Sequence, residues 1–358
     1  MRKIKLVVSD FHLGRGRLMP DGGINILEEF IFDHRFIDFL DYYSHDEFRR
    51  DEVELILNGD FMNTIMVDYE EQYPRALTEA GCVEKVQKIL DGHPELFEAL
   101  AGFAKAPNHR LSYIAGNHDP AVIWPAVRRQ LQDRIQSEIL FPGFNYAFDG
   151  IWVEHGQQRV ASNRFDPDHL IIRTKGTEDP ILNLPWGCFF VIDYINPIKR
   201  FRRYVDRIQP FGRYLFSAYL FDTGFAIRAT YRLLSFLLSH QFVKHRWHTT
   251  SLRDALDIVK QLSIIPDLEK DAQEILQTGP YHTVIFGHNH QPAYVKVGRA
   301  KLYVNVGTWN DIIHLEIQNL GRQRRMTYAY IEYRNQERPQ THLKLWKGRH
   351  VIEEDMMF

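Results

Sequence analysis

The chain has 358 residues, of which 44% are hydrophobic and 25% are charged, and its net charge is −2. These values are typical of a globular protein with one large or two ordinary domains, and the near-zero charge excludes a general attraction to nucleic acids or membranes. Two cysteines exclude a disulfide framework and favour a reducing compartment, so we expect a cytoplasmic protein.

A β-branched apolar run at residues 3–9 predicts the first strand, and Asp10-Phe11-His12 follows it directly. Removing this run as a signal peptide would remove the strand or its ligands, so we interpret it as part of the fold. Arg15 and Arg17 come next. They could bind a phosphate, or they could be ordinary solvated loop residues.

Four further apolar runs end in polar motifs of the same kind. These motifs are Asn58-Gly59-Asp60, Gly116-Asn117-His118-Asp119, His155-Gly156 and Gly287-His288-Asn289-His290. Sites in open α/β sheets form at the carboxyl ends of the strands, so these side chains are expected to meet at one edge. The glycines allow the sharp turns that such loops require.

Each motif alone could be a turn or a helix cap, but five of them at strand ends favour a common site. Together they supply enough ligands for two divalent metals that share one carboxylate. Oxygen and imidazole ligands without thiolates suit manganese, iron or zinc rather than a structural zinc site.

In these motifs the chain resembles the calcineurin-like metallophosphoesterase superfamily, over residues 1–160 and 281–315. The resemblance implies an α/β fold in which a sandwich of two mixed sheets is flanked by helices. It implies a dinuclear site in which a hydroxide bridging the metals attacks phosphorus in line. We expect manganese to be the preferred metal.

The resemblance also assigns roles to individual residues. Asp60 would bridge the two metals, and His118 would act beside the substrate phosphate together with Asn117. The first metal would be held by Asp10, His12 and His290, and the second by Asn117, His155 and His288.

One position departs from the superfamily pattern, which usually has an acid three residues after the bridging Asp. Asn63 takes that place here. It can orient His118 by a hydrogen bond, or contact the substrate, but it adds no charge. His118 would then be a weaker general acid, or Asp119 would assist it, or the leaving group would need little protonation.

Residues 161–280 interrupt the motif series and predict a mainly helical insertion over the site, with the core formed by 1–160 and 281–358. Apolar runs at residues 189–192, 214–216 and 233–238 are typical of helices. Between residues 196 and 253, 11 basic residues face only two acidic ones, and aromatic residues alternate with them.

This basic, aromatic segment suits an anionic amphiphile or a large polyanion, although it could also be a solvated face opposite a packing stripe. Its longest uncharged stretch is too short to span a bilayer. We therefore expect at most peripheral association with the inner face of the membrane. Near the end of the chain, residues 301–306 predict a strand, and residues 327–333 alternate like an exposed strand.

The resemblance extends in plan to bacterial enzymes that split UDP-2,3-diacylglucosamine, which carry a helical insert that accepts acyl chains. Those enzymes typically have Gly-Asn-Arg-Asp where this chain has His118. We therefore expect a metal-dependent hydrolase of a phosphodiester or a pyrophosphate-linked substrate, with such a nucleotide-linked lipid as one candidate. The alternatives are a nuclease whose insertion holds nucleic acid, and a non-catalytic metal-binding scaffold.

Overall fold

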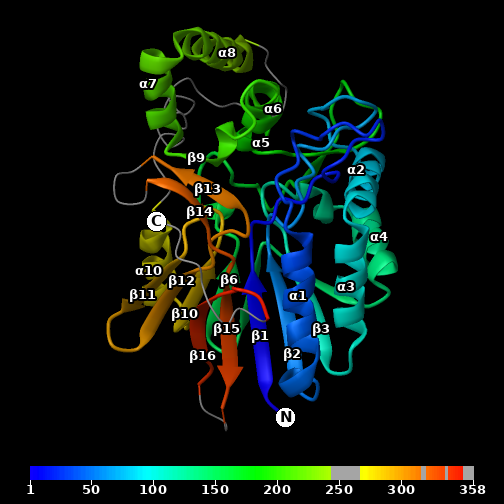
Figure 1. The fold of residues 1–358 in the computed structure, drawn as a ribbon, viewed down its shortest axis with the longest axis vertical. Helices are drawn as coiled ribbons and strands as arrows, with labels where there is room; N and C mark the ends of the chain where they lie inside the picture. Colours follow the sequence, from blue (N-terminus) through cyan, green and yellow to red (C-terminus); the bar gives the residue numbers. More distant parts are fainter. Residues whose placement is uncertain (243–266, 316–319, 335–337, 350–358) are drawn as a thin grey trace.

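The computed structural model describes residues 1–242, 267–315, 320–334 and 338–349. Two β-sheets pack face to face, and helices cover the outer face of each (Figure 1). The predicted sandwich of two mixed sheets flanked by helices is therefore confirmed. Within the described ranges, no helix combines the length and the apolar character needed to cross a bilayer.

The first sheet has six strands in the order β16-β15-β1-β2-β3-β4. Strands β1 to β4 run parallel, and β15 and β16 continue the sheet in antiparallel fashion. Their bounds are β1 Lys3–Val8, β2 Glu52–Asn58, β3 His109–Ile114, β4 Ile139–Gly143, β15 Thr327–Tyr333 and β16 Gln340–Leu345.

The second sheet has five strands in the order β11-β12-β10-β6-β5, with β6, β10 and β12 parallel. Its strands are β5 Asn145–Phe148, β6 Ile151–Glu154, β10 Thr283–Phe286, β11 Ala293–Val297 and β12 Lys301–Asn305. Two small sheets lie outside the sandwich. They consist of β7 Ile171–Ile172 with β8 Ile181–Leu182, and of β14 Gly321–Arg324, β13 Asp311–His314 and β9 Ile208–Gln209.

Helices of the core lie on both outer faces of the sandwich. They are α1 Asp33–Ser44, α2 Glu79–Gly92, α3 Pro94–Lys105, α4 Pro125–Ile135 and α10 Leu268–Thr278, with short turns η1 Asp46–Phe48, η2 Pro120–Ile123 and η3 Gln157–Arg159. The remaining helices of the described residues lie between residues 186 and 242, which we call the central segment. They are α5 Trp186–Phe190, η4 Val191–Ile195, α6 Asn196–Lys199, η5 Val205–Arg207, α7 Phe211–Phe221 and α8 Thr223–Phe242.

Strand β1 shows why the apolar runs become two-faced strands. Successive side chains alternate across a sheet, so Val7 points into the interface between the sheets while Leu6 and Val8 point toward the helices. Ile56 and Ile285 meet Val7 in the inter-sheet core, and all of these side chains are fully buried. Both faces of the central strands are therefore apolar, as expected for parallel strands covered on both sides.

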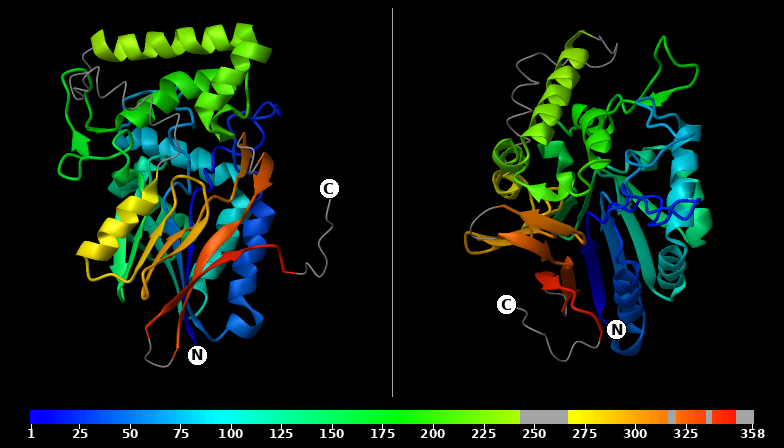
Figure 2. Two further views of the ribbon diagram at one scale, coloured as in Figure 1. Left: turned by 90° about the vertical axis from the view of Figure 1, so that its left-hand side faces the viewer. Right: turned by 45° about the horizontal axis from the view of Figure 1, so that its top comes forward.

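The central segment covers the carboxyl end of the parallel strands, with α7 and α8 outermost (Figures 1 and 2). The runs predicted to be helical lie in α5 and η4, in α7 and in α8. Helix α10, which the predicted boundaries place in the insertion, packs through Leu268, Ala272 and Leu276 against the second sheet. The basic residues Lys244, Arg246 and Arg253 lie outside the described residues.

The prediction of an exposed strand at Thr327–Tyr333 was wrong about exposure. Strand β15 is internal to the first sheet, between β1 and β16. Ala329 and Ile331 enter the inter-sheet core, while Tyr328 and Tyr330 pack on the helical side. The alternation of aliphatic and aromatic residues therefore reflects two different buried faces rather than one buried and one solvent-exposed face.

Truncating an inter-sheet side chain should test this core. Ile56→Ala is expected to lower the free energy of unfolding by about 2–5 kcal/mol, because it leaves a cavity between two sheets. Ile171→Ala provides the matched control, since Ile171 is 41% exposed on β7. Urea unfolding followed by circular dichroism measures both, and equal losses in the two variants would contradict the packing described.

Candidate metal centre

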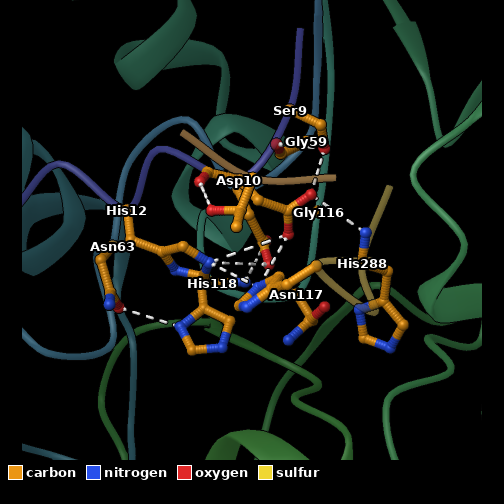
Figure 3. A network of polar contacts seen from close by, with 12 residues as sticks. Ser9, Asp10, His12, Gly59, Asn63, Gly116, Asn117, His118 and His288 are labelled. Carbon is orange, nitrogen blue, oxygen red and sulfur yellow. Dashed lines mark hydrogen bonds and ion pairs between the residues drawn. The ribbon is translucent and has the colours of Figure 1, made fainter. Parts of the chain in front are cut away.

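The loops that follow β1, β2, β3, β6 and β10 converge at one edge of the sandwich, beneath the central segment (Figure 1). Figure 3 shows several of the side chains that these loops carry. These loops carry the five motifs identified in the sequence. The structure brings together all eight side chains that were predicted to bind the metals or to act beside the metals. They are Asp10, His12, Asp60, Asn117, His118, His155, His288 and His290.

The backbone is strained at this edge. A positive φ is uncommon outside glycine and costs about 1–3 kcal/mol where the surroundings impose it. Strain of this kind clusters at functional sites, because a loop optimised for stability alone would avoid it. Among non-glycine residues the positive-φ set includes five of the eight, namely Asp10, His12, Asp60, His288 and His290, with φ between 52° and 70°.

Glycines leave the space that the acidic side chains occupy. A Cβ atom on Gly116 would lie 2.2 Å from Oδ1 of Asp60, and one on Gly287 would lie 2.6 Å from Oδ2 of Asp10. Both separations are far below van der Waals contact. The glycines of the Gly-Asn-His and Gly-His motifs are therefore required by close approach to the carboxylates.

One group of possible ligands forms around Asp10. Its Oδ2 accepts hydrogen bonds from Ser9 Oγ at 2.5 Å and from the backbone N–H of His288 at 3.0 Å. Its Oδ1 lies 3.1 Å from His290 Nε2 and 3.8 Å from His12 Nε2. One carboxylate oxygen is thus anchored, and the other is left for a cation.

A second group forms around Asp60. Its Oδ1 accepts a hydrogen bond from the backbone N–H of His118 at 2.8 Å, and its Oδ2 lies 3.1 Å from His155 Nε2. His155 Nδ1 lies 2.8 Å from the carbonyl oxygen of Asn58, so this nitrogen carries the proton and Nε2 faces the centre. Asp60, His155 and His288 offer ligand atoms that all lie within 4.8 Å of one another, as do those of Asp10, His12 and His290.

Several buried polar atoms of these side chains and of Asn117 form no hydrogen bond among the described residues, although Asp10 Oδ1 and His155 Nε2 each lie 3.1 Å from a group of opposite charge. They are Asp10 Oδ1, His12 Nδ1, Asn117 Oδ1, His155 Nε2 and His290 Nδ1. Buried polar atoms are almost always paired in proteins, so several unpaired ones on side chains that converge indicate a missing partner. The donor set fits two divalent cations, in the grouping that the resemblance implied.

Without a metal, protons take its place. Burial lowers the pKa of His12, but the neighbouring carboxylates of Asp10, Glu29 and Asp60 outweigh it and raise the pKa to about 9. Burial likewise opposes protonation of His155, but the charges of Asp60 and Asp10 raise its pKa to about 10. Burial lowers the pKa of His288 to about 3, assisted by the charge of His155.

His118 and Asn63 form the contact expected from the sequence. His118 Nδ1 lies 3.1 Å from Asn63 Oδ1 (Figure 3). Burial lowers the pKa of His118 to about 4, so the ring is neutral at pH 7. Asp119 does not assist it, because its oxygens accept hydrogen bonds from Tyr113, Gly116 and Phe61, and this holds the loop in place.

The structure does not bring the two predicted arginines to the centre. Arg15 Nη1 lies 2.5 Å from Asp68 Oδ1, and Arg17 is an exposed loop residue. A cavity adjoins the histidines, and its lining includes none of Arg15, Arg17 and Asn63. A phosphate contact by any of the three therefore stays a prediction.

A cavity of about 230 Å³ adjoins the centre. His12, His118, His288 and His290 form its polar end, and the central segment forms an apolar wall. That wall includes Phe190, Val191, Ile195, Val205, Ile208 and Phe211.

Sequence reasoning missed the charged residues of this cavity. Glu29, Asp206 and Arg207 line it, and Lys199 lies buried behind them, 2.6 Å from Glu29 Oε1 and 2.5 Å from Asp206 Oδ2. No motif marks these residues. A sequence signal was present only for Lys199 and Arg207, which belong to the basic segment.

No protein-family model matches the chain, and no curated protein matches it. The fold comparison finds a candidate 5'-nucleotidase from Staphylococcus aureus (10% identity, TM-score 0.36), matched over 99% of this chain and 56% of that protein. It also finds a candidate phosphoesterase from Streptococcus pneumoniae (11%, 0.24; coverage 96% and 99%) and a dimetal phosphatase from Danio rerio (9%, 0.34; 94% and 98%). Such low TM-scores support no conclusion about function, so function rests on the site itself.

Metal should compete with protons at this centre. In the metal-free protein, protonated His12 and His155 stabilise the fold below their ordinary pKa of 6.5, and this contribution is lost as the pH rises through about 9 to 10. The increase in melting temperature caused by Mn²⁺ should therefore grow between pH 6 and pH 8.5. Thermal unfolding measures it, and a pH-independent increase would contradict this account.

The control for this measurement is a histidine outside the centre. His45→Gln should retain the full effect of Mn²⁺, because His45 is an exposed residue whose ring contacts Asp41 on α1. His155→Gln should lose most of it.

Proposed function

We propose that the protein is a metal-dependent phosphoester hydrolase of the calcineurin-like type, acting on a phosphodiester or a pyrophosphate-linked substrate. The observation that carries the proposal is the convergence of two anchored carboxylates and four imidazoles, several of whose buried polar atoms form no hydrogen bond among the described residues. This arrangement is costly unless divalent cations complete it.

The two groups support the ligand assignment that the resemblance implied. Asp10, His12 and His290 would hold one divalent cation, and Asn117, His155 and His288 the other, with Asp60 between them. When bound, the cations supply Lewis acidity toward the phosphoryl oxygens. Mn²⁺, Fe²⁺ and Zn²⁺ all accept this ligand set, and manganese is our choice for assay.

The chain's own residues prepare the substrate. In this arrangement His118 carries its proton on Nδ1 and donates it in a hydrogen bond to Asn63 Oδ1. Its Nε2 is then left to accept or pass on a proton at the phosphoryl group. Since Asn63 is neutral, it does nothing to favour the imidazolium form. A leaving group that departs as an anion, such as the phosphate of a pyrophosphate linkage, suits this arrangement better than an alkoxide.

The cavity supports a substrate with an apolar part. Phosphate at the histidine end would place neighbouring groups against Phe190, Ile195 and Phe211. Arg207 also lines the cavity and is 8% exposed. Its Nη2 is held by the carbonyl of Glu29 at 2.6 Å, while its Nε has no partner among the described residues and could take a second anionic group. A nucleotide-linked lipid has this combination of groups.

The outer helices support contact with an anionic membrane surface. Helices α7 and α8 form the outermost layer at the top of the left view of Figure 2. Large apolar side chains are exposed on both helices, and basic residues accompany them. Helices that lie in a membrane interface combine these two features. The exposed side chains are Phe216, Leu220, Phe221, Ile227, Tyr231, Leu234 and Leu238, and the nearby basic residues are Arg213, Arg228 and Arg232.

The activity can be tested on bis(p-nitrophenyl) phosphate and the matching monoester with Mn²⁺. We expect hydrolysis of the diester in preference to the monoester. Asp60→Asn should reduce it by more than the 10- to 100-fold loss typical of residues that only support a metal ligand. A pyrophosphate-linked lipid nucleotide and single-stranded DNA would be tested next. Metal binding without turnover of any of these would contradict the proposal and favour a non-catalytic scaffold.

The membrane surface can be tested by sedimentation with vesicles. The wild-type protein should bind vesicles of anionic phospholipid more strongly than neutral ones, and added salt should weaken the binding. Leu220→Ser combined with Phe221→Ser should reduce it, because both side chains would lose their apolar contact. Leu18→Ser, at a residue 63% exposed in the first loop, is the control. Equal binding by all variants would rule out α7 as the contact.

A further inference from the structure

We infer that Glu29 is a positioning residue that sets the proton-bearing nitrogen of two histidines at once, His12 and His118. The inference rests on the proposed function and deepens it. Glu29 is 6% exposed and precedes α1, in a part of the chain where no motif was found.

The first branch runs from Glu29 to His12. Glu29 Oε2 lies 3.6 Å from His12 Nδ1, while His12 Nε2 faces Asp10 and His290. A carboxylate on this side favours a proton on Nδ1, which leaves Nε2 unprotonated as a metal ligand. Carboxylates play this role behind many metal-binding histidines.

The second branch runs through an amide. Asn63 Nδ2 donates a long hydrogen bond of 3.5 Å to Glu29 Oε2, and Asn63 Oδ1 lies 3.1 Å from His118 Nδ1. A carboxylate can only accept hydrogen bonds, so the amide must turn its N–H₂ toward Glu29 and its oxygen toward His118. His118 must then carry its proton on Nδ1, and Nε2 is left for the reaction.

The central segment fixes Glu29 in this place. Lys199 Nζ lies 2.6 Å from Glu29 Oε1, and Arg207 Nη2 donates to the Glu29 backbone carbonyl at 2.6 Å. Lys199 is 1% exposed, so its ammonium must be matched by charge. Glu29 therefore gives one oxygen to Lys199 and the other to the histidine side.

Glu29→Gln tests this division because glutamine has only one acceptor oxygen. The charged Lys199 should take that oxygen, which turns the N–H₂ of the substituted side chain toward Asn63 and His12. Asn63 would then have to rotate, so His118 would lose the acceptor of its Nδ1 proton, and His12 would lose the carboxylate charge 3.6 Å from its Nδ1. Lys199 keeps Asp206 at 2.5 Å, so no buried ammonium is left alone and the variant should fold.

Two readouts separate the branches. Calorimetric titration with Mn²⁺ should show binding about 10- to 100-fold weaker in Glu29→Gln, through His12. Turnover of bis(p-nitrophenyl) phosphate at saturating Mn²⁺ should fall by about tenfold or more, through His118. Adding Asn63→Asp places an acceptor directly on His118. The double variant should therefore recover turnover but not metal affinity.

Glu54→Gln is the matched control, since Glu54 is also a buried glutamate paired with a buried lysine, Lys5, but on the sheet away from the histidines. It should leave Mn²⁺ affinity unchanged. Wild-type affinity and turnover in Glu29→Gln would overturn the inference, and so would losses that Asn63→Asp fails to repair in turnover. If the wild-type protein itself binds no Mn²⁺, the proposed function fails instead.

Discussion

The burial of two carboxylates, Asp10 and Asp60, beside four imidazoles is the constraint on which the rest of the structure depends. Charges of this kind are expensive to bury unless opposite charge lies within a few ångströms. The parallel strands deliver them to one edge, the glycines give them room, and the positive-φ loops turn them inward. Each of these features lowers the stability of the fold on its own, and a cation bound by the group would offset that cost.

The central segment adds to this centre rather than merely covering it. Its apolar side chains form one wall of the cavity, and its Lys199 reaches through to Glu29, beside His12. Docking of the segment and the geometry of the candidate metal ligands are therefore linked by a short buried chain of charges. The same segment presents apolar and basic side chains on its outer helices, so a membrane surface and a lipid-bearing substrate would be met by one part of the fold.

Much of the site was predictable because it is written in local motifs. A strand followed by Asp-Phe-His or Gly-Asn-His sets its own backbone geometry, and parallel strands bring such ends together without further information. Glu29 and Asp206 were not predictable. An acid in a loop is usually solvated, and only tertiary packing reveals that a lysine distant in sequence is buried against it. Arg15 shows the converse, because proximity in sequence suggested a phosphate contact and the structure gives it Asp68.

The fold followed the same division. The strands were predictable from short apolar runs. The predicted bounds of β15 agree with the structure, but its predicted exposure does not, because period-two alternation does not say what covers each face of a strand. The packing of α10 on the second sheet likewise depends on contacts that no local pattern encodes.

The central claim is that this edge of the sandwich holds two metals in two adjacent ligand groups. The most direct measurement is anomalous X-ray diffraction at the manganese absorption edge from crystals grown with Mn²⁺. The account predicts two anomalous peaks on either side of Asp60, one against His12 and His290 and one against His155 and His288. A single peak, or peaks only at surface carboxylates, would contradict it.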